Sequence, residues 1–120
     1  MKRTCGINIG STSVKVAVLD AGRVVFSGAL AHEGDVPKTL LRLLHQAGIK
    51  PGNRTLVTGN EGRKQLRVKG VIEAIALQET LRLKDIKCKA VVSLGGEDLV
   101  VYVLDEPGNL QNSFSGNKCA

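Results

Sequence analysis

The sequence has very few aromatic residues: two Phe, one Tyr and no Trp make up 2% of its 120 residues. Proteins that bind single-stranded nucleic acid stack bases on aromatic side chains, so a net charge of +6 does not by itself favour such a partner. The densest basic segment holds Arg63, Lys64, Arg67 and Lys69. We interpret it as a solvated loop or a partner-facing surface, and we expect no nucleic-acid partner.

Long apolar runs and paired cysteines are also missing. No run approaches the roughly 20 residues that a membrane-spanning helix needs, and the first residues lead into an alternating strand rather than a signal-peptide core. The cysteines are odd in number and widely spaced, which implies no disulfide framework. These observations favour a reducing, cytoplasmic setting without a membrane partner. Cys5 and Cys88 lie in apolar segments, where we expect inert core residues.

Glycine, in contrast, is abundant, with 14 residues. Three β-rich segments, residues 4–9, 13–19 and 23–31, are separated by glycine-containing turns at Gly10 and Gly22. A chain of this length is one domain or part of one, with an aliphatic core.

A helix is expected after Asp35, which is a typical N-cap residue. Pro37 falls in the first turn, and Gly48 stands where a helix commonly ends. Leu40, Leu44 and Ala47 form the apolar stripe of this helix.

Further along, residues 54–58 read as a strand that ends at Gly59, and residues 70–83 read as a helix. That helix is expected to face inward through Val71, Ile72, Ile75 and Ala76. A strand resumes at Cys88. The order β-β-β-α-β-α-β predicts an α/β fold of the ribonuclease-H-like (actin-like ATPase) class, a mixed sheet with an antiparallel β-meander and flanking helices.

An internal repeat is the most informative feature. The stretch from Ile9 to Gly28 recurs as Leu94 to Gly116, with Gly95 lying 85 residues after Gly10. One inserted residue later, Gly22 matches Gly108. We interpret this as a duplicated β-meander, although any two hairpins share glycine and valine.

The turns of this repeat favour anions, because glycine lets a ligand approach the backbone and successive N–H groups form an anion site. Hydroxyl groups and a lysine would add donors. The candidate phosphate-binding residues are Gly10, Ser11, Thr12, Ser13 and Lys15 in the first copy, and Gly95 and Gly96 in the second. Two such turns could hold a polyphosphate from both sides. Taken by itself, the first turn is equally compatible with a plain hairpin, and no P-loop is present.

The segment Gly6-Ile-Asn-Ile-Gly-Ser-Thr-Ser-Val-Lys15 resembles the phosphate motif of the activator ATPases of 2-hydroxyacyl-CoA dehydratases and benzoyl-CoA reductases. These activators belong to the superfamily of actin, sugar kinases and heat-shock chaperone ATPases. Three further segments are similar to that family: Val57-Thr58-Gly59, Leu94-Gly-Gly-Glu-Asp98 and Gly116-Asn-Lys-Cys-Ala120.

The resemblance implies a homodimer that binds ATP and Mg²⁺, shares one [4Fe-4S] cluster, and drives an electron onto a dehydratase or reductase component. It makes Cys119 the first cluster ligand, an accessible thiolate as such clusters require; a free surface thiol is the alternative. It also implies that residues 1–87 are a first actin-like lobe, and that residues 88–120 open a second lobe that is cut short.

Two acids that the resemblance leads us to expect are missing. Asn8 replaces the aspartate that organises the metal, and Ser93 occupies the matching position in the second copy. Glu97 and Asp98 could take over metal contacts, or cap local N–H groups. Glu73 is read either as a hinge residue facing the cleft or as a solvated helix position.

Two functions therefore remain open. The first is the nucleotide-binding part of an ATP-dependent iron–sulfur activator (activase), whose 120 residues alone we expect to be inactive and to which we assign no catalytic residue. The alternative is a non-catalytic, degenerate nucleotide-binding or scaffold module. A sugar kinase is a weaker third option. We also expect self-association through residues 89–114, where apolar strands lack helical cover.

Overall fold

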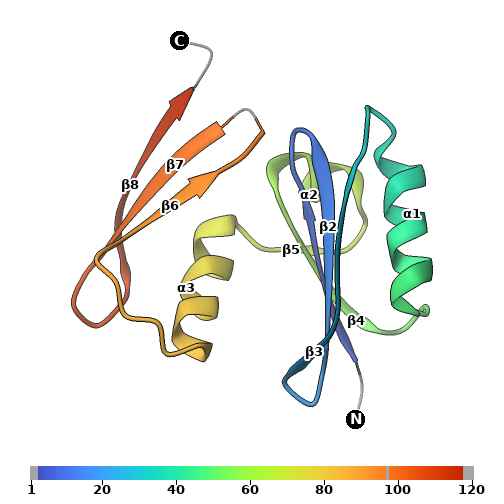
Figure 1. Cartoon of the computed structure of the whole chain (residues 1–120), viewed down its shortest axis with the longest axis horizontal. Coiled ribbons are helices and arrows are strands. Elements are labelled where there is room, and N and C mark those ends of the chain that lie inside the picture. The colour runs from blue at the N-terminus through green and yellow to red at the C-terminus, as the bar shows by residue number, and fades with distance from the viewer. Residues whose placement is uncertain (1–2, 97, 118–120) are drawn as a thin grey trace. The chain divides into compact units, whose positions relative to one another are not determined.

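The computed structural model describes residues 3–96 and 98–117. The chain divides into two compact units, Met1–Val71 and Ile72–Ala120. The sequence places the boundary between lobes after residue 87, and that lobe assignment stays a prediction. Figure 1 shows the elements. In chain order they are β1 (Thr4–Ile9), β2 (Ser13–Asp20), β3 (Arg23–Ala31), α1 (Val36–Ala47), β4 (Arg54–Thr58), α2 (Asn60–Gln65), β5 (Lys69–Gly70), α3 (Glu73–Leu83), β6 (Ala90–Leu94), β7 (Asp98–Leu104) and β8 (Leu110–Asn117).

The first unit is built on a five-stranded mixed sheet in the order β3-β2-β1-β4-β5. β1–β2 and β2–β3 pair antiparallel, whereas β1–β4 and β4–β5 pair parallel. Successive side chains of a strand point to opposite faces, and the inward positions of β1 and β2 are apolar. These inward residues are Cys5, Ile7, Ile9, Val14, Val16 and Val18. The mixed sheet confirms the fold class expected from the sequence.

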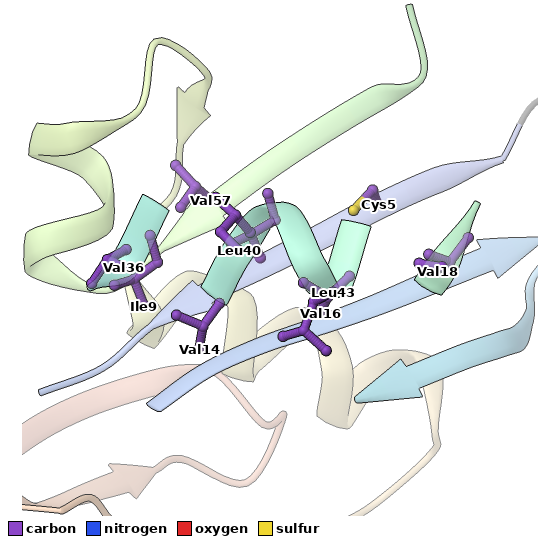
Figure 2. Close-up of a cluster of buried hydrophobic side chains, with 11 residues drawn as sticks. Cys5, Ile9, Val14, Val16, Val18, Val36, Leu40, Leu43 and Val57 are labelled. Carbon is purple, nitrogen blue, oxygen red and sulfur yellow. The ribbon is translucent and has the colours of Figure 1, made fainter. Parts of the chain in front are cut away.

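Helix α1 covers that apolar face. The Asp35 side chain accepts a hydrogen bond of 3.1 Å from the N–H of Lys38, and Gly48 closes the helix at a φ of 67°. Figure 2 shows Leu40 and Leu43 of α1 among the buried side chains of the strands. Leu43, which lies outside the expected stripe, is fully buried, whereas Leu44 of that stripe is only half-buried.

Three predicted boundaries are wrong. The basic segment is not a plain loop, because residues 60–65 form α2, and the short strand β5 follows it. Helix α3 begins at Glu73 rather than at residue 70, and its expected inward residues Ile72 and Ile75 are exposed. Cys88 lies before β6 and outside any strand. In the described part of the chain, no helix is long and apolar enough to span a membrane.

The second unit is an antiparallel sheet, β6-β7-β8, joined to α3. Gln78 of α3 accepts a hydrogen bond of 2.8 Å from the N–H of Leu110. The two copies also share an irregularity in strand pairing. The register between the second and third strands of the meander shifts after Val18 in the first copy and after Val103 in the second.

The end of the sequence repeat was misaligned. Gly28 pairs with Val16, and the equivalent of Val16 in the second copy, Val101, pairs with Phe114. Phe114 is therefore the counterpart of Gly28, and Gly116 is not. With one residue inserted before Gly108, the third strands of the two copies align at the same offset as Gly22 and Gly108, and the match of Gly28 to Gly116 runs two residues too far.

Candidate functional site

The two glycine turns share one backbone geometry. The N–H of Gly10 donates to the carbonyl of Ser13 at 2.9 Å, and the N–H of Gly95 donates to the carbonyl of Asp98 at 2.8 Å. The flanking strand residues pair in equivalent register, Asn8 with Lys15 and Ser93 with Val100. The sequence repeat is thus a structural repeat.

The first turn has unused donors. In the part of the chain that the structure describes, no hydrogen bond uses the N–H of Ser11 or the N–H of Thr12. Both residues are exposed, and so is Lys15 on the adjoining strand. Free N–H groups in a tight turn attract an anion, and the hydroxyls and the ammonium group add to that attraction.

The end of β4 lies beside this turn. Thr58 is the parallel neighbour of Asn8, so both side chains lie on the same face of the sheet. The Thr58 hydroxyl oxygen is buried and has no hydrogen-bond partner among the described residues. Buried hydroxyls are normally satisfied. Asn8 and Thr58 therefore place an amide and a buried, unpaired hydroxyl next to each other at the ends of β1 and β4.

Gly59 allows the chain to leave β4 close to β1. Its φ is 95°, a conformation that favours glycine, and a Cβ at this position would overlap the carbonyl oxygen of Ile9. Gly62 of α2 is similarly close, because a Cβ there would lie 2.9 Å from Cγ2 of Val57. This close packing supports the backbone of β1 directly before the first glycine turn.

His32 is a residue of this site that the sequence reading missed. One nitrogen of its ring, Nε2, lies 3.1 Å from the carbonyl oxygen of Gly10, and the other, Nδ1, accepts a hydrogen bond of 3.0 Å from the N–H of Gly34. Its backbone N–H donates to the carbonyl of Thr12 at 3.1 Å. No motif links His32 to the turn, which lies 22 residues earlier.

A carboxylate of α3, that of Glu73, contacts the strands of the second copy. Oε1 of Glu73 accepts hydrogen bonds from Ser93 Oγ at 2.9 Å and from the hydroxyl of Tyr102 at 3.3 Å. Glu73 is exposed, as a solvated helix position would be, and its carboxylate also bonds to side chains of β6 and β7. Burial, together with the nearby Glu73 carboxylate, raises the pKa of Tyr102.

The structure describes some of the remaining predicted site residues and not others. Asp98 is exposed at the start of β7, and its carbonyl oxygen accepts the hydrogen bond that closes the turn. Gly96 is exposed in the turn. Glu97 and Cys119, the predicted metal contact and cluster ligand, lie outside the described residues.

The described cysteines do not form a metal site. Cys5 is buried in β1, as expected, and burial raises the pKa of its thiol. Cys88 is half-buried and lies outside the strands. Among the described residues, no three His, Cys, Asp or Glu side chains are grouped to hold a metal ion.

Solved structures with this fold were found by comparison. The activator of 2-hydroxyisocaproyl-CoA dehydratase from Clostridium difficile, with bound ADPNP, matches 98% of this chain with a TM-score of 0.82 and 25% identity. Component A of (R)-2-hydroxyglutaryl-CoA dehydratase from Acidaminococcus fermentans matches 100% with a TM-score of 0.80 and 23% identity. The fold is that of the dehydratase activators. The resemblance inferred from the sequence is thereby confirmed.

The match covers 47% and 49% of those two proteins, so the chain spans about half of their length. The ethanolamine utilization protein EutJ from Carboxydothermus hydrogenoformans shares the fold at a TM-score of 0.70 and 15% identity. No family model matches the sequence, and a search of curated proteins gives no match either.

Proposed function

We propose that this chain is the nucleotide-binding part of an ATP-dependent activator that serves a CoA-ester dehydratase. The observation that carries the proposal is the first glycine turn, in which the N–H groups of Ser11 and Thr12 have no acceptor among the described residues. The similar activator from Clostridium difficile was solved with bound ADPNP, which supports a nucleoside triphosphate as the ligand.

The turn suits a phosphate for physical reasons. Backbone N–H groups at a glycine turn are fixed before the ligand arrives, so no side-chain entropy is lost when they bind it. Lys15 is exposed and adds a positive charge on β2. The Mg²⁺ that accompanies ATP would be contacted through its water shell by Asn8 and Thr58. Because neither side chain is charged, these residues support binding of the nucleotide better than they support its hydrolysis.

The remaining features of an activator are part of the same proposal. They are a [4Fe-4S] cluster with Cys119 as a ligand, a homodimer, a cytoplasmic location and electron transfer to a dehydratase or reductase partner. Anaerobic reconstitution of a longer chain that carries the whole second lobe should give cluster absorbance that its C119A variant lacks. Retention of the absorbance in that variant would refute the assignment of the ligand.

Calorimetric titration with ADPNP and Mg²⁺ tests the nucleotide site. We expect the chain to bind, and the K15A variant to bind about tenfold more weakly, the equivalent of losing about 1.4 kcal/mol. Lys38 is exposed on α1 and has no role in the turn, so K38A is the matched control. Failure of the unmodified chain to bind would overturn the proposal.

Asn8 and Ser93 favour a second candidate, a degenerate module that binds nucleotide without hydrolysing it. An ATPase assay distinguishes the two functions. Binding without turnover, in a longer chain that carries the whole second lobe, would support the module. Turnover that the N8D variant leaves unchanged would argue against degeneracy.

A further inference from the structure

In the first turn, the carbonyl groups of Gly10, Thr12 and Ser13 are bonded, whereas the N–H groups of Ser11 and Thr12 have no acceptor among the described residues. The carbonyl of Gly10 faces the His32 ring at 3.1 Å, and the carbonyl of Thr12 accepts the backbone N–H of His32 at 3.1 Å. The carbonyl of Ser13 is taken by the N–H of Gly10. A single residue, His32, thus contacts two of the three carbonyl oxygens that these bonds occupy.

The proton of the His32 ring can be assigned from its two contacts. The N–H of Gly34 donates to Nδ1, so Nδ1 carries no proton, because a protonated nitrogen cannot accept. The proton of a neutral ring is then on Nε2, where it donates to the carbonyl of Gly10. The ring is therefore held from both sides, and its proton is directed at the turn.

We propose that His32 is the positioning residue of the phosphate turn. By donating from Nε2 to Gly10 and from its backbone to Thr12, it directs carbonyl oxygens away from the place where an anion binds. A carbonyl oxygen turned toward a phosphate would repel it, whereas the N–H groups of Ser11 and Thr12 attract it. The inference rests on the proposed nucleotide function and deepens it by assigning the residue that preorganises the turn.

Two substitutions separate the two ring contacts. In H32Q, the amide nitrogen is as many bonds from the backbone as Nε2 and can still donate to Gly10. In H32N, the amide oxygen is as many bonds away as Nδ1 and can still accept from Gly34, but the side chain is too short for Gly10. His45 is exposed in the last turn of α1, so H45N is the control.

Affinity for ADPNP with Mg²⁺ is the first measurement. We expect H32Q and H45N to bind within about twofold of the unmodified chain, and H32N to bind about five- to tenfold more weakly, as for loss of one hydrogen bond. Thermal unfolding of all variants serves to exclude a general loss of fold. H32N binding as tightly as the unmodified chain would overturn the role of His32.

Hydrogen exchange of the Gly10 N–H, whose bond to Ser13 closes the turn, is measured without nucleotide as the second test, and it separates the two proposals. We expect faster exchange in H32N than in H32Q. If the unmodified chain does not bind ADPNP, the proposed function fails, while the exchange data still report whether His32 holds the turn. Equal exchange in H32N and H32Q would refute that hold, whatever the chain binds.

Discussion

The hydroxyl of Ser93 donates a hydrogen bond of 2.9 Å to the carboxylate of Glu73, which lies 20 residues earlier in the chain. Tyr102 donates to the same oxygen at 3.3 Å. The resemblance to the activators leads us to expect an aspartate at position 93. In this chain the negative charge next to that strand position is supplied by α3, and it also attaches α3 to the sheet.

Replacing Glu73 with Gln should loosen this attachment. An amide oxygen accepts the two hydroxyls less strongly than a carboxylate does, so we expect the free energy of unfolding to fall by about 1–2 kcal/mol. Urea denaturation is the measurement. E79Q is the control on the same helix, because Glu79 makes an exposed ion pair with Arg82, and such pairs contribute about 0–1 kcal/mol. Equal losses in the two variants would contradict the role of Glu73.

Tyr102 should make stability depend on alkaline pH. Its pKa is raised in the folded chain by burial and by Glu73, so the folded state retains the phenol proton at a pH where the unfolded chain releases it. The stabilisation is complete below the unfolded pKa of about 10 and is lost as the pH rises through the folded value. Urea denaturation between pH 8 and pH 11 should show this decline, and Y102F should decline less. Identical slopes would exclude Tyr102 as its source.

Replacing Thr58 should change stability and nucleotide affinity in different ways. Replacing its buried, unpaired hydroxyl with the methyl group of Val removes an unsatisfied polar atom. We therefore expect T58V to be as stable as the unmodified chain, or more stable by about 1 kcal/mol. We also expect affinity for Mg²⁺-ADPNP to fall several-fold. T55V is the control, because Thr55 lies on the same strand and donates to the carbonyl of Asn53. Unchanged affinity in T58V would remove Thr58 from the site.

The outer face of the second sheet should promote association. Val92, Leu94 and Phe114 share the face opposite Ser93 and are 56%, 78% and 58% exposed. The equivalent face of the first sheet is covered by α1. We expect light scattering to show association at high protein concentration, and the variant V92T/L94T to reduce it. V25T, at an exposed position of β3, is the control. A monomer at all concentrations would contradict this expectation.

The fold was largely predictable from local signals. Alternating apolar residues define β1 and β2, and Asp35 and Gly48 define the ends of α1. Helix α2 was missed because it has no apolar periodicity and contains Gly62, whose value comes from close packing on Ile9 and Val57. That contact is tertiary, and local propensity does not indicate it.

The candidate site was predictable only where it is local. The glycine turns could be predicted from the repeat, because each turn is a local structure. It is closed by a hydrogen bond between residues three apart in the sequence. His32 and Glu73, in contrast, contact residues that lie 22 and 20 positions away from them in the sequence. Their partners are a backbone carbonyl in one case and two hydroxyls in the other, and neither combination produces a pattern along the sequence.

The matching register shifts after Val18 and after Val103 have a consequence for how the meander tolerates change. The extra residue of the second copy lies beyond the shift, in the hairpin that contains Gly108, and the glycine turn at the other end of the strand keeps its equivalent hydrogen bond. Length variation is thus confined to one end of the meander. A loop inserted between Asp105 and Asn109 should leave the glycine turn at Gly95 intact, which makes that hairpin the natural place for a label or a fused domain.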